Sequence, residues 1–162
     1  MTEQKIRTLA FYQPFLSLMI WGKKKETRWV RKNKKPPFPL GVYAFYSTRK
    51  PCTHEQLMDW SGIDIMLKIT EITGNDPYKY HNGYLLASAK LLSLRPMAKE
   101  DEELAYVKFV GERTVKDKNG NDVVQVQWIL EFDPVLAIEP VKFNEGKQGV
   151  GFLPEKYLKI AN

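Results

Sequence analysis

Residues 12–31 read Tyr12-Gln13-Pro14-Phe15-Leu16-Ser17-Leu18-Met19-Ile20-Trp21-Gly22-Lys23-Lys24-Lys25-Glu26-Thr27-Arg28-Trp29-Val30-Arg31. Pro14 suits the first position of a helix, and Gly22 suits the residue after its last turn. Between them, Phe15, Leu18 and Met19 fall on one face at helical spacing. The segment therefore predicts one or two buried helical turns that lead into a charged loop.

Positive charge is concentrated directly after this helix. Between Gly22 and Lys35 the only acid is Glu26, and the eight basic residues are Lys23, Lys24, Lys25, Arg28, Arg31, Lys32, Lys34 and Lys35. The whole chain carries a net charge of +6, so the rest of it is close to neutral. A basic surface attracts polyanions. We therefore expect a phosphate backbone as the first partner.

The length of 162 residues predicts one domain, 1–162, that needs neither a metal nor a disulfide to fold. Cys52 is the only cysteine, and His54 and His81 have no partners at metal-ligand spacing, so we expect no metal and no cofactor. No apolar run approaches the roughly 18 residues of a membrane helix, and no signal-peptide pattern begins the chain. The expected location is cytoplasmic.

Signals for strands and helices are spread along the rest of the chain. Residues 9–12, 41–47, 84–94 and 123–132 predict strands, with an extended proline-rich connector at 35–41. Asn119-Gly120 predicts a hairpin. Asp133-Pro134 predicts the end of the strand before it, because proline lacks the amide that a ladder needs. Thr53 and Gln56 form a capping box, and the helix after it should break at Gly62.

Acidic residues 100–103 precede an apolar stretch, which places them at a helix start where they favour its dipole. An alternative interpretation is that this acidic run docks over the basic loop and limits nonspecific binding.

Gln13-Pro14-Phe15, followed by Lys23, Glu26 and Arg28, resembles the signature of the ASCH (activating signal cointegrator homology) family. Together with the strand at 84–94 and the segment Gly146-Lys147-Gln148-Gly149, the resemblance covers about residues 8–153. It implies an α+β fold of PUA-like type, a small mixed β-barrel with peripheral helices that usually handles RNA.

The spacing of the motif permits two registers. Reading from Glu26 makes Lys23 the motif lysine; reading from Gly22 makes it Lys24 instead, with Thr27 in the glutamate position and Trp29 in the arginine position. The first register keeps three charged positions, and we prefer it.

We expect a basic cleft that binds RNA, other single-stranded nucleic acid or a modified nucleoside. Glu26 would accept hydrogen bonds from a base edge while basic side chains address phosphate, and an exposed aromatic side chain, Trp29 first, would stack on a base. The candidate binding residues are Gln13, Lys23, Glu26, Arg28, Trp29, Ser47, Arg49, Lys50 and Gln148.

Two other functions stay open. Some bacterial members of the resembling family hydrolyse 4-acetylcytidine with a lysine, a threonine and a distant glutamate. The resemblance then implies catalytic candidates Lys23, Lys24, Thr27 and Glu26, with the distant glutamate at Glu71, Glu103 or Glu131. The other function is a protein-interaction adaptor whose basic loop meets an acidic partner. The sequence does not specify an oligomeric state.

Overall fold

The computed structural model describes residues 6–22, 24–73, 81–143 and 150–157. Within these ranges, seven strands form one mixed sheet of order β2-β6-β4-β3-β1-β7, with β5 also paired to β6. The strands are β1 (Arg7–Phe11), β2 (Glu26–Arg31), β3 (Gly41–Ser47), β4 (Tyr84–Pro96), β5 (Glu112–Lys116), β6 (Asp122–Lys142) and β7 (Val150–Phe152). Only the β1/β3 pair is parallel.

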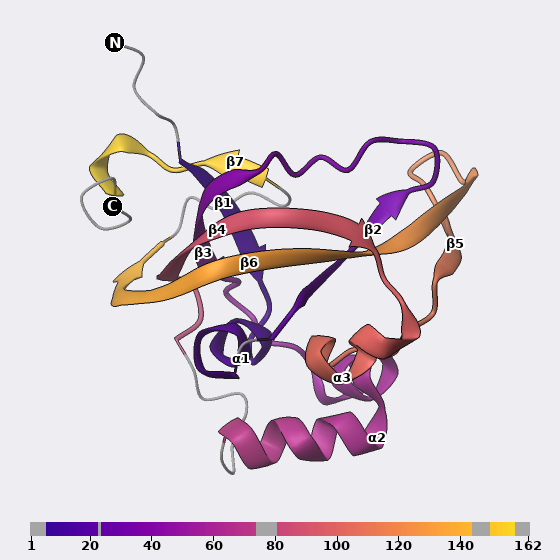
Figure 1. The fold of residues 1–162 in the computed structure, drawn as a ribbon, viewed down its shortest axis with the longest axis horizontal. Helices are drawn as coiled ribbons and strands as arrows, with labels where there is room; N and C mark the ends of the chain where they lie inside the picture. Colours follow the sequence, from indigo (N-terminus) through magenta and orange to yellow (C-terminus); the bar gives the residue numbers. More distant parts are fainter. Residues whose placement is uncertain (1–5, 23, 74–80, 144–149, 158–162) are drawn as a thin grey trace.

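The sheet curls into a half-barrel, and the helices gather below its long strands β4 and β6 (Figure 1). The helices are α1 (Phe15–Gly22), α2 (His54–Thr73) and α3 (Glu102–Ala105), with 3-10 turns η1 (Lys99–Asp101) and η2 (Glu155–Tyr157). This is the α+β architecture with peripheral helices that the sequence predicted. Among the described residues, no helix is long and apolar enough to span a membrane.

Helix α1 is buried on two sides, which explains why nearly all of it is apolar. Leu16 and Met19 belong to a hydrophobic cluster that also contains Phe45 of β3. Phe15 and Leu18 belong instead to a cluster shared with α2. The predicted helix after Pro14 is confirmed, and its two-sided burial fixes where the following segment enters the site.

Strand β6 corrects one prediction. We expected Asp133-Pro134 to end a strand, yet β6 runs without interruption from Asp122 to Lys142. Its register against β4 shifts here, since Leu91 faces Phe132 and Ala89 faces Val135. Three steps along β6 thus oppose two along β4, and this β-bulge removes the need for an amide at Pro134.

Helix α2 begins and breaks as predicted. The Thr53 amide donates to Gln56 Oε1 at 2.9 Å, and the Gln56 amide donates to Thr53 Oγ1 at 3.1 Å, which completes the capping box. Gly62 interrupts the helix with φ +82° and ψ 168°, a conformation open almost only to glycine. The first part of α2 is thereby turned toward β2 and the segment after α3.

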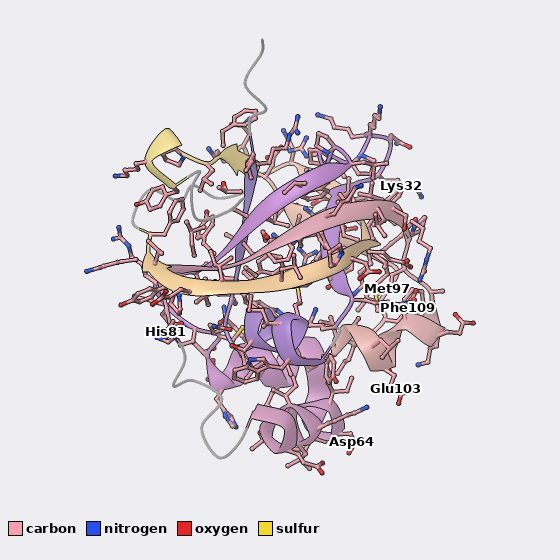
Figure 2. The ribbon with its side chains drawn as sticks, turned by 60° about the vertical axis from the view of Figure 1, so that its left-hand side comes forward. Lys32, Asp64, His81, Met97, Glu103 and Phe109 are labelled. Atoms are coloured by element: carbon pink, nitrogen blue, oxygen red, sulfur yellow. The ribbon has the colours of Figure 1, made fainter. Side chains whose placement is uncertain are left out.

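The acidic run at 100–103 begins a helical segment, as predicted, and it also carries a buried charge. Asp101 accepts two hydrogen bonds of 2.6 Å from Arg95 and one of 3.4 Å from Lys25. Near this clamp, Met97 and Phe109 lie together in a small apolar cluster where β4 leaves the sheet (Figure 2). The clamp therefore ties the first residues of the basic loop to the end of β4.

Candidate functional site

A cavity of about 640 Å³ lies where the curled sheet brings the end of β1 near β2. Helix α2 and the segment between α3 and β5 complete its wall. Its lining combines five aromatic residues with four basic and two acidic ones. The lining residues are Ala10, Phe11, Tyr12, Phe15, Lys24, Glu26, Thr27, Arg28, Trp29, Thr48, Asp59, Trp60, Val107, Lys108, Val110, Arg113 and Gln127.

Glu26 is the centre of the buried part of this cavity, with 8% of its side chain exposed. Its Oε1 accepts hydrogen bonds from Lys24 Nζ at 3.3 Å and from the Thr27 amide at 2.9 Å. Its Oε2 accepts one from Arg28 Nη2 at 3.1 Å. Two cations and one amide therefore hold a single carboxylate in a fixed orientation.

Arg28 also joins the two ends of the half-barrel. Its Nη2 donates to the Ala10 carbonyl oxygen at 2.6 Å, and its guanidinium lies 5.0 Å from the centre of the Phe11 ring. Among the described residues, β7 pairs with β1 at Arg7, Thr8 and Leu9, directly before Ala10. The arginine thus links β2 to a backbone acceptor at the end of β1.

Burial and charge oppose each other at this ion cluster. Burial lowers the pKa of Lys24, and the charge of Glu26 reverses only part of that shift. Burial alone would raise the pKa of Glu26, but Lys24, Arg28 and the Thr27 amide together lower it. Glu26 is therefore ionised at neutral pH, and Lys24 releases its proton more readily than an exposed lysine does.

Aromatic side chains form the walls above the ion cluster. Tyr12 and Phe15 pack against Trp60 with ring centres 5.7 and 6.4 Å apart. On the β2 side, the guanidinium of Arg113 lies 4.2 Å from the centre of the Trp29 ring. The cavity thus presents large flat surfaces beside charged groups.

Gln127 positions the outer wall from inside the sheet. Its side-chain amide nitrogen donates to the Lys108 carbonyl at 2.9 Å, and its Oε1 accepts from the amides of Val110 and Gly111. Only 1% of this residue is exposed. Gln127 is buried because the segment after α3 covers it and satisfies its side-chain amide.

The predicted site residues divide into three groups. Lys24, Glu26, Thr27, Arg28 and Trp29 line the cavity together. Lys23 and Gln148 lie outside the described residues. The residues outside the lining of this cavity are Gln13, Ser47, Arg49 and Lys50.

Gln13 and Ser47 have structural contacts instead. Gln13 Oε1 accepts from the amide and the hydroxyl of Ser17, and Ser47 Oγ donates to the His81 carbonyl at 2.6 Å. Both side chains are buried, whereas Arg49 and Lys50 are exposed. The first two therefore support the start of α1 and the segment before β4.

None of the three glutamates proposed as a distant catalytic acid lines the cavity. Glu71 is exposed on α2, and Glu103 points outward from α3 (Figure 2), where it pairs with Lys68. Glu131 pairs with Arg95. Of the described residues, the acids that do line the cavity are Glu26 and Asp59.

Sequence reasoning missed Asp59, Trp60, Lys108, Arg113 and Gln127. They come from three parts of the chain that lie far from the motif in sequence, and the structure brings them to one cavity. Gln127 follows another glutamine of β6, Gln125, at a spacing of two, so its polarity alone did not distinguish it. The other four occur in segments that show no distinguishing pattern.

The basic cluster is divided by the fold. Lys24 is buried, Lys25 contacts Asp101, and Lys32 contacts Glu112 at 3.0 Å. Other members are exposed along the end of β2 and the loop that follows, namely Arg31, Lys34 and Lys35. The formal charge of the sequence thus overstates the charge available to a partner.

No family model matches the chain, and no curated protein matches it either. A comparison with solved structures finds similarity to the crystal structure of a mutant ZmASCH protein from Zymomonas mobilis, with a TM-score of 0.48 and 11% identity. The match covers 98% of this chain and 95% of that chain. That protein bears the name of the family that the motif at residues 13–29 resembles.

Proposed function

We propose that the cavity binds a nucleobase, presented by single-stranded RNA or by a modified nucleoside. The observation that carries the proposal is one cavity of about 640 Å³ that combines aromatic walls with a buried, oriented carboxylate. Its volume falls within the range of about 300 to 1,000 Å³ typical of small-molecule sites. A base needs flat surfaces for its faces and hydrogen-bonding groups for its edge, and the cavity offers both.

Glu26 is suited to the base edge. A carboxylate has about four lone-pair positions, and the three hydrogen bonds that Glu26 accepts from Lys24, Thr27 and Arg28 use three of them. The remaining acceptor position would receive an amino or imino hydrogen of the base.

The backbone of β2 adds a second recognition element. Gln127 lies opposite Trp29. Its backbone amide donates to the Gly111 carbonyl, and its backbone carbonyl accepts from the Met97 amide. Because hydrogen-bonded and non-hydrogen-bonded pairs alternate along antiparallel strands, the amide and carbonyl of Trp29 point away from β6. The cavity wall thus offers a backbone donor and acceptor to the polar edge of a base.

Binding of ribonucleosides and of a short single-stranded RNA, measured by calorimetry, tests the proposal. Trp60→Ala removes a stacking surface worth about 1 to 3 kcal/mol, so the dissociation constant should rise roughly 5- to 150-fold. Trp21→Ala, on α1 and outside the lining, is the matched control and should leave affinity unchanged. Absence of binding, or equal effects of the two variants, contradicts the proposal.

A second candidate function is hydrolysis of an acylated nucleoside such as 4-acetylcytidine. It is favoured by the position of Lys24 and Thr27 on the same cavity wall, three residues apart, and by the lowered pKa of Lys24. A lowered pKa favours the neutral amine of a lysine, and the neutral amine can act as a base or a nucleophile. Water would then cleave the amide bond to give acetate and cytidine.

Chromatography of 4-acetylcytidine incubated with the protein tests this activity. Lys24→Ala should abolish turnover while Lys23→Ala preserves it, which would also assign the register of the motif. The reverse result would assign Lys23 instead. If the wild-type protein binds 4-acetylcytidine without releasing acetate, the site is a binding site alone.

A further inference from the structure

The cations that the motif contributes to the cavity are already engaged. Lys24 and Arg28 both contact Glu26, and Arg28 also donates to the Ala10 carbonyl. Their side chains are 1% and 24% exposed, respectively. A negatively charged part of the ligand would therefore compete with Glu26 for both side chains.

Two other cations, Lys108 and Arg113, line the same cavity and are exposed. Within the described part of the chain, neither forms a salt bridge with a carboxylate. Glu112, the acidic neighbour of Arg113, contacts Lys32 instead. The outer part of the cavity thus holds positive charge available to a ligand, with Asp59 as the opposing acid of the lining.

The structure holds Lys108 in place from three directions. Its amide donates to the Trp60 carbonyl at 2.8 Å, and its carbonyl accepts from the Gln127 side chain at 2.9 Å. Its aliphatic stem lies over Gly62, where a Cβ atom would be 2.8 Å from Lys108 Cε. The break in α2 therefore leaves room for the stem of this lysine.

Arg113 is oriented as well. Its guanidinium stacks on Trp29, and its Nε donates to Gln125 Oε1 at 2.8 Å. Among the described residues, its two terminal nitrogens form no hydrogen bond and no ion pair. A planar guanidinium held by its face and by Nε presents those nitrogens as a fork, the geometry that matches two oxygens of a phosphate.

We propose that Lys108 and Arg113 bind a phosphate group of the ligand, so that the cavity takes a nucleotide, free or within RNA, rather than a bare nucleoside. This inference rests on the proposed function, since the base would occupy the aromatic part of the cavity. The phosphate would lie at the solvent side, where it keeps part of its hydration.

Calorimetric titration of the four ribonucleosides and their 5′-monophosphates tests the inference. Hydrogen bonds to charged groups contribute about 1.5 to 3 kcal/mol, so a monophosphate should bind at least about tenfold more tightly than its nucleoside. Lys108→Ala and Arg113→Ala should each reduce that ratio severalfold. The ratio within each variant is the readout, because Arg113→Ala also alters the surface of Trp29.

Lys118→Ala is the matched control, since Lys118 is an exposed lysine of the β5–β6 hairpin outside the lining. It should leave the ratio unchanged. Equal affinities of nucleoside and monophosphate overturn the inference while leaving the base pocket intact. If Lys108→Ala and Arg113→Ala both keep the preference for the monophosphate, the assignment of the phosphate to these two residues is also overturned. Failure of every nucleoside and monophosphate to bind contradicts the proposed function itself.

An unphosphorylated RNA trinucleotide distinguishes the two sources of phosphate. If its internal phosphodiester is the natural ligand group, it should bind at least as tightly as the best monophosphate and lose affinity in both variants. If the free nucleotide is the ligand, the trinucleotide should bind more weakly than the monophosphate. Either result supports the phosphate site, provided that the two variants weaken the tighter ligand.

Discussion

Glu26 is the residue that connects the buried charges of the cavity. Its carboxylate joins the start of β2 to Lys24 and, through Arg28, to the end of β1. Removing a buried carboxylate that has charged partners strongly lowers the free energy of unfolding, because those partners then stay buried without a counter-charge. One side chain therefore contributes both to stability and to the proposed recognition of a base.

Glu26→Gln should lower the free energy of unfolding by about 3 to 5 kcal/mol, the range for a buried pair that loses one partner. Urea denaturation at pH 7 measures it. Glu112→Gln, which breaks the exposed pair with Lys32, is the matched control and should cost about 1 kcal/mol or less. Similar losses in the two variants would show that the buried cluster is not a stabilising ion pair.

The pH dependence of stability should identify the same carboxylate. Because the fold lowers the pKa of Glu26, its ionised form stabilises the protein above the unfolded-state pKa, about 4.3. That contribution is lost as pH falls through the lower folded-state pKa. Thermal unfolding should therefore be measured from pH 7 to pH 3 for the wild-type protein and for Glu26→Gln. The variant should be less stable than the wild type by the largest amount above about pH 5, and the difference in stability should narrow in acid. A difference in stability that does not change with pH would contradict the lowered pKa of Glu26.

The resemblance pointed to a segment that lines the cavity but left the register of its motif open. Sequence spacing cannot say which of two adjacent lysines enters the interior, because that depends on how β2 leaves α1. The structure buries Lys24 against Glu26, with its ammonium 5.2 Å from the centre of the Phe15 ring. The preferred lysine, Lys23, lies outside the described residues, so its assignment stays a prediction.

At the scale of elements, the break in α2 links helix geometry to the cavity. Gly62 permits both the change of direction and the close passage of Lys108. The first part of α2 contributes Asp59 and Trp60 to the lining. An unbroken helix would hold these two residues in a different orientation relative to β2.

Gly62→Ala should cost about 1 to 3 kcal/mol from its backbone conformation, and a smaller amount from moving the end of the Lys108 side chain away from the new methyl group. Gly120→Ala is the control, since Gly120 also has a positive φ, +77°, but open space around it. The double variant Gly62→Ala/Lys108→Ala should recover part of the additional loss. Urea denaturation of the two single variants and the double variant measures this double-mutant cycle. If the stability losses of the single variants simply add in the double variant, the contact between Gly62 and Lys108 is contradicted.

Elements were predicted well where the signal was local. The capping box, the hairpin at Asn119-Gly120 and the break at Gly62 depend on residues close in sequence, and all three were confirmed. The predicted end of the strand at Pro134 was wrong because a bulge against β4 accommodates the missing amide. A single sequence does not reveal which neighbouring strand will supply such a bulge.

For the whole molecule, the curl of the sheet creates the site. The end of β1 and strand β2 are separated along the sheet by β3, β4 and β6, yet Arg28 bonds to Ala10 across the gap. Exposed cations occur at the end of β2, in the loop after it and on the cavity wall: Arg31, Lys34, Lys35, Lys108 and Arg113. These are the residues that we expect to contact an RNA backbone.

Affinity for a single-stranded RNA decamer should fall with salt. If about five cations contact phosphates, the slope of log affinity against log salt is near −3.5. Lys34→Ala/Lys35→Ala should reduce its magnitude by about 1.4, whereas Lys90→Ala, an exposed lysine of β4, should not change it. Filter binding at several salt concentrations measures the slope. A slope near zero would exclude a backbone contribution.

The sequence by itself determined the α+β class, the helix after Pro14 and the segment that carries Glu26, because these depend on periodicity and on local turn chemistry. Only the tertiary structure decided which cations remain available to a ligand. Lys24 and Arg28 are engaged by Glu26, while Lys108 and Arg113 reach the same cavity from a distant segment. The physical reason is that charge pairing and burial depend on distances in space, and the curl of the sheet sets those distances.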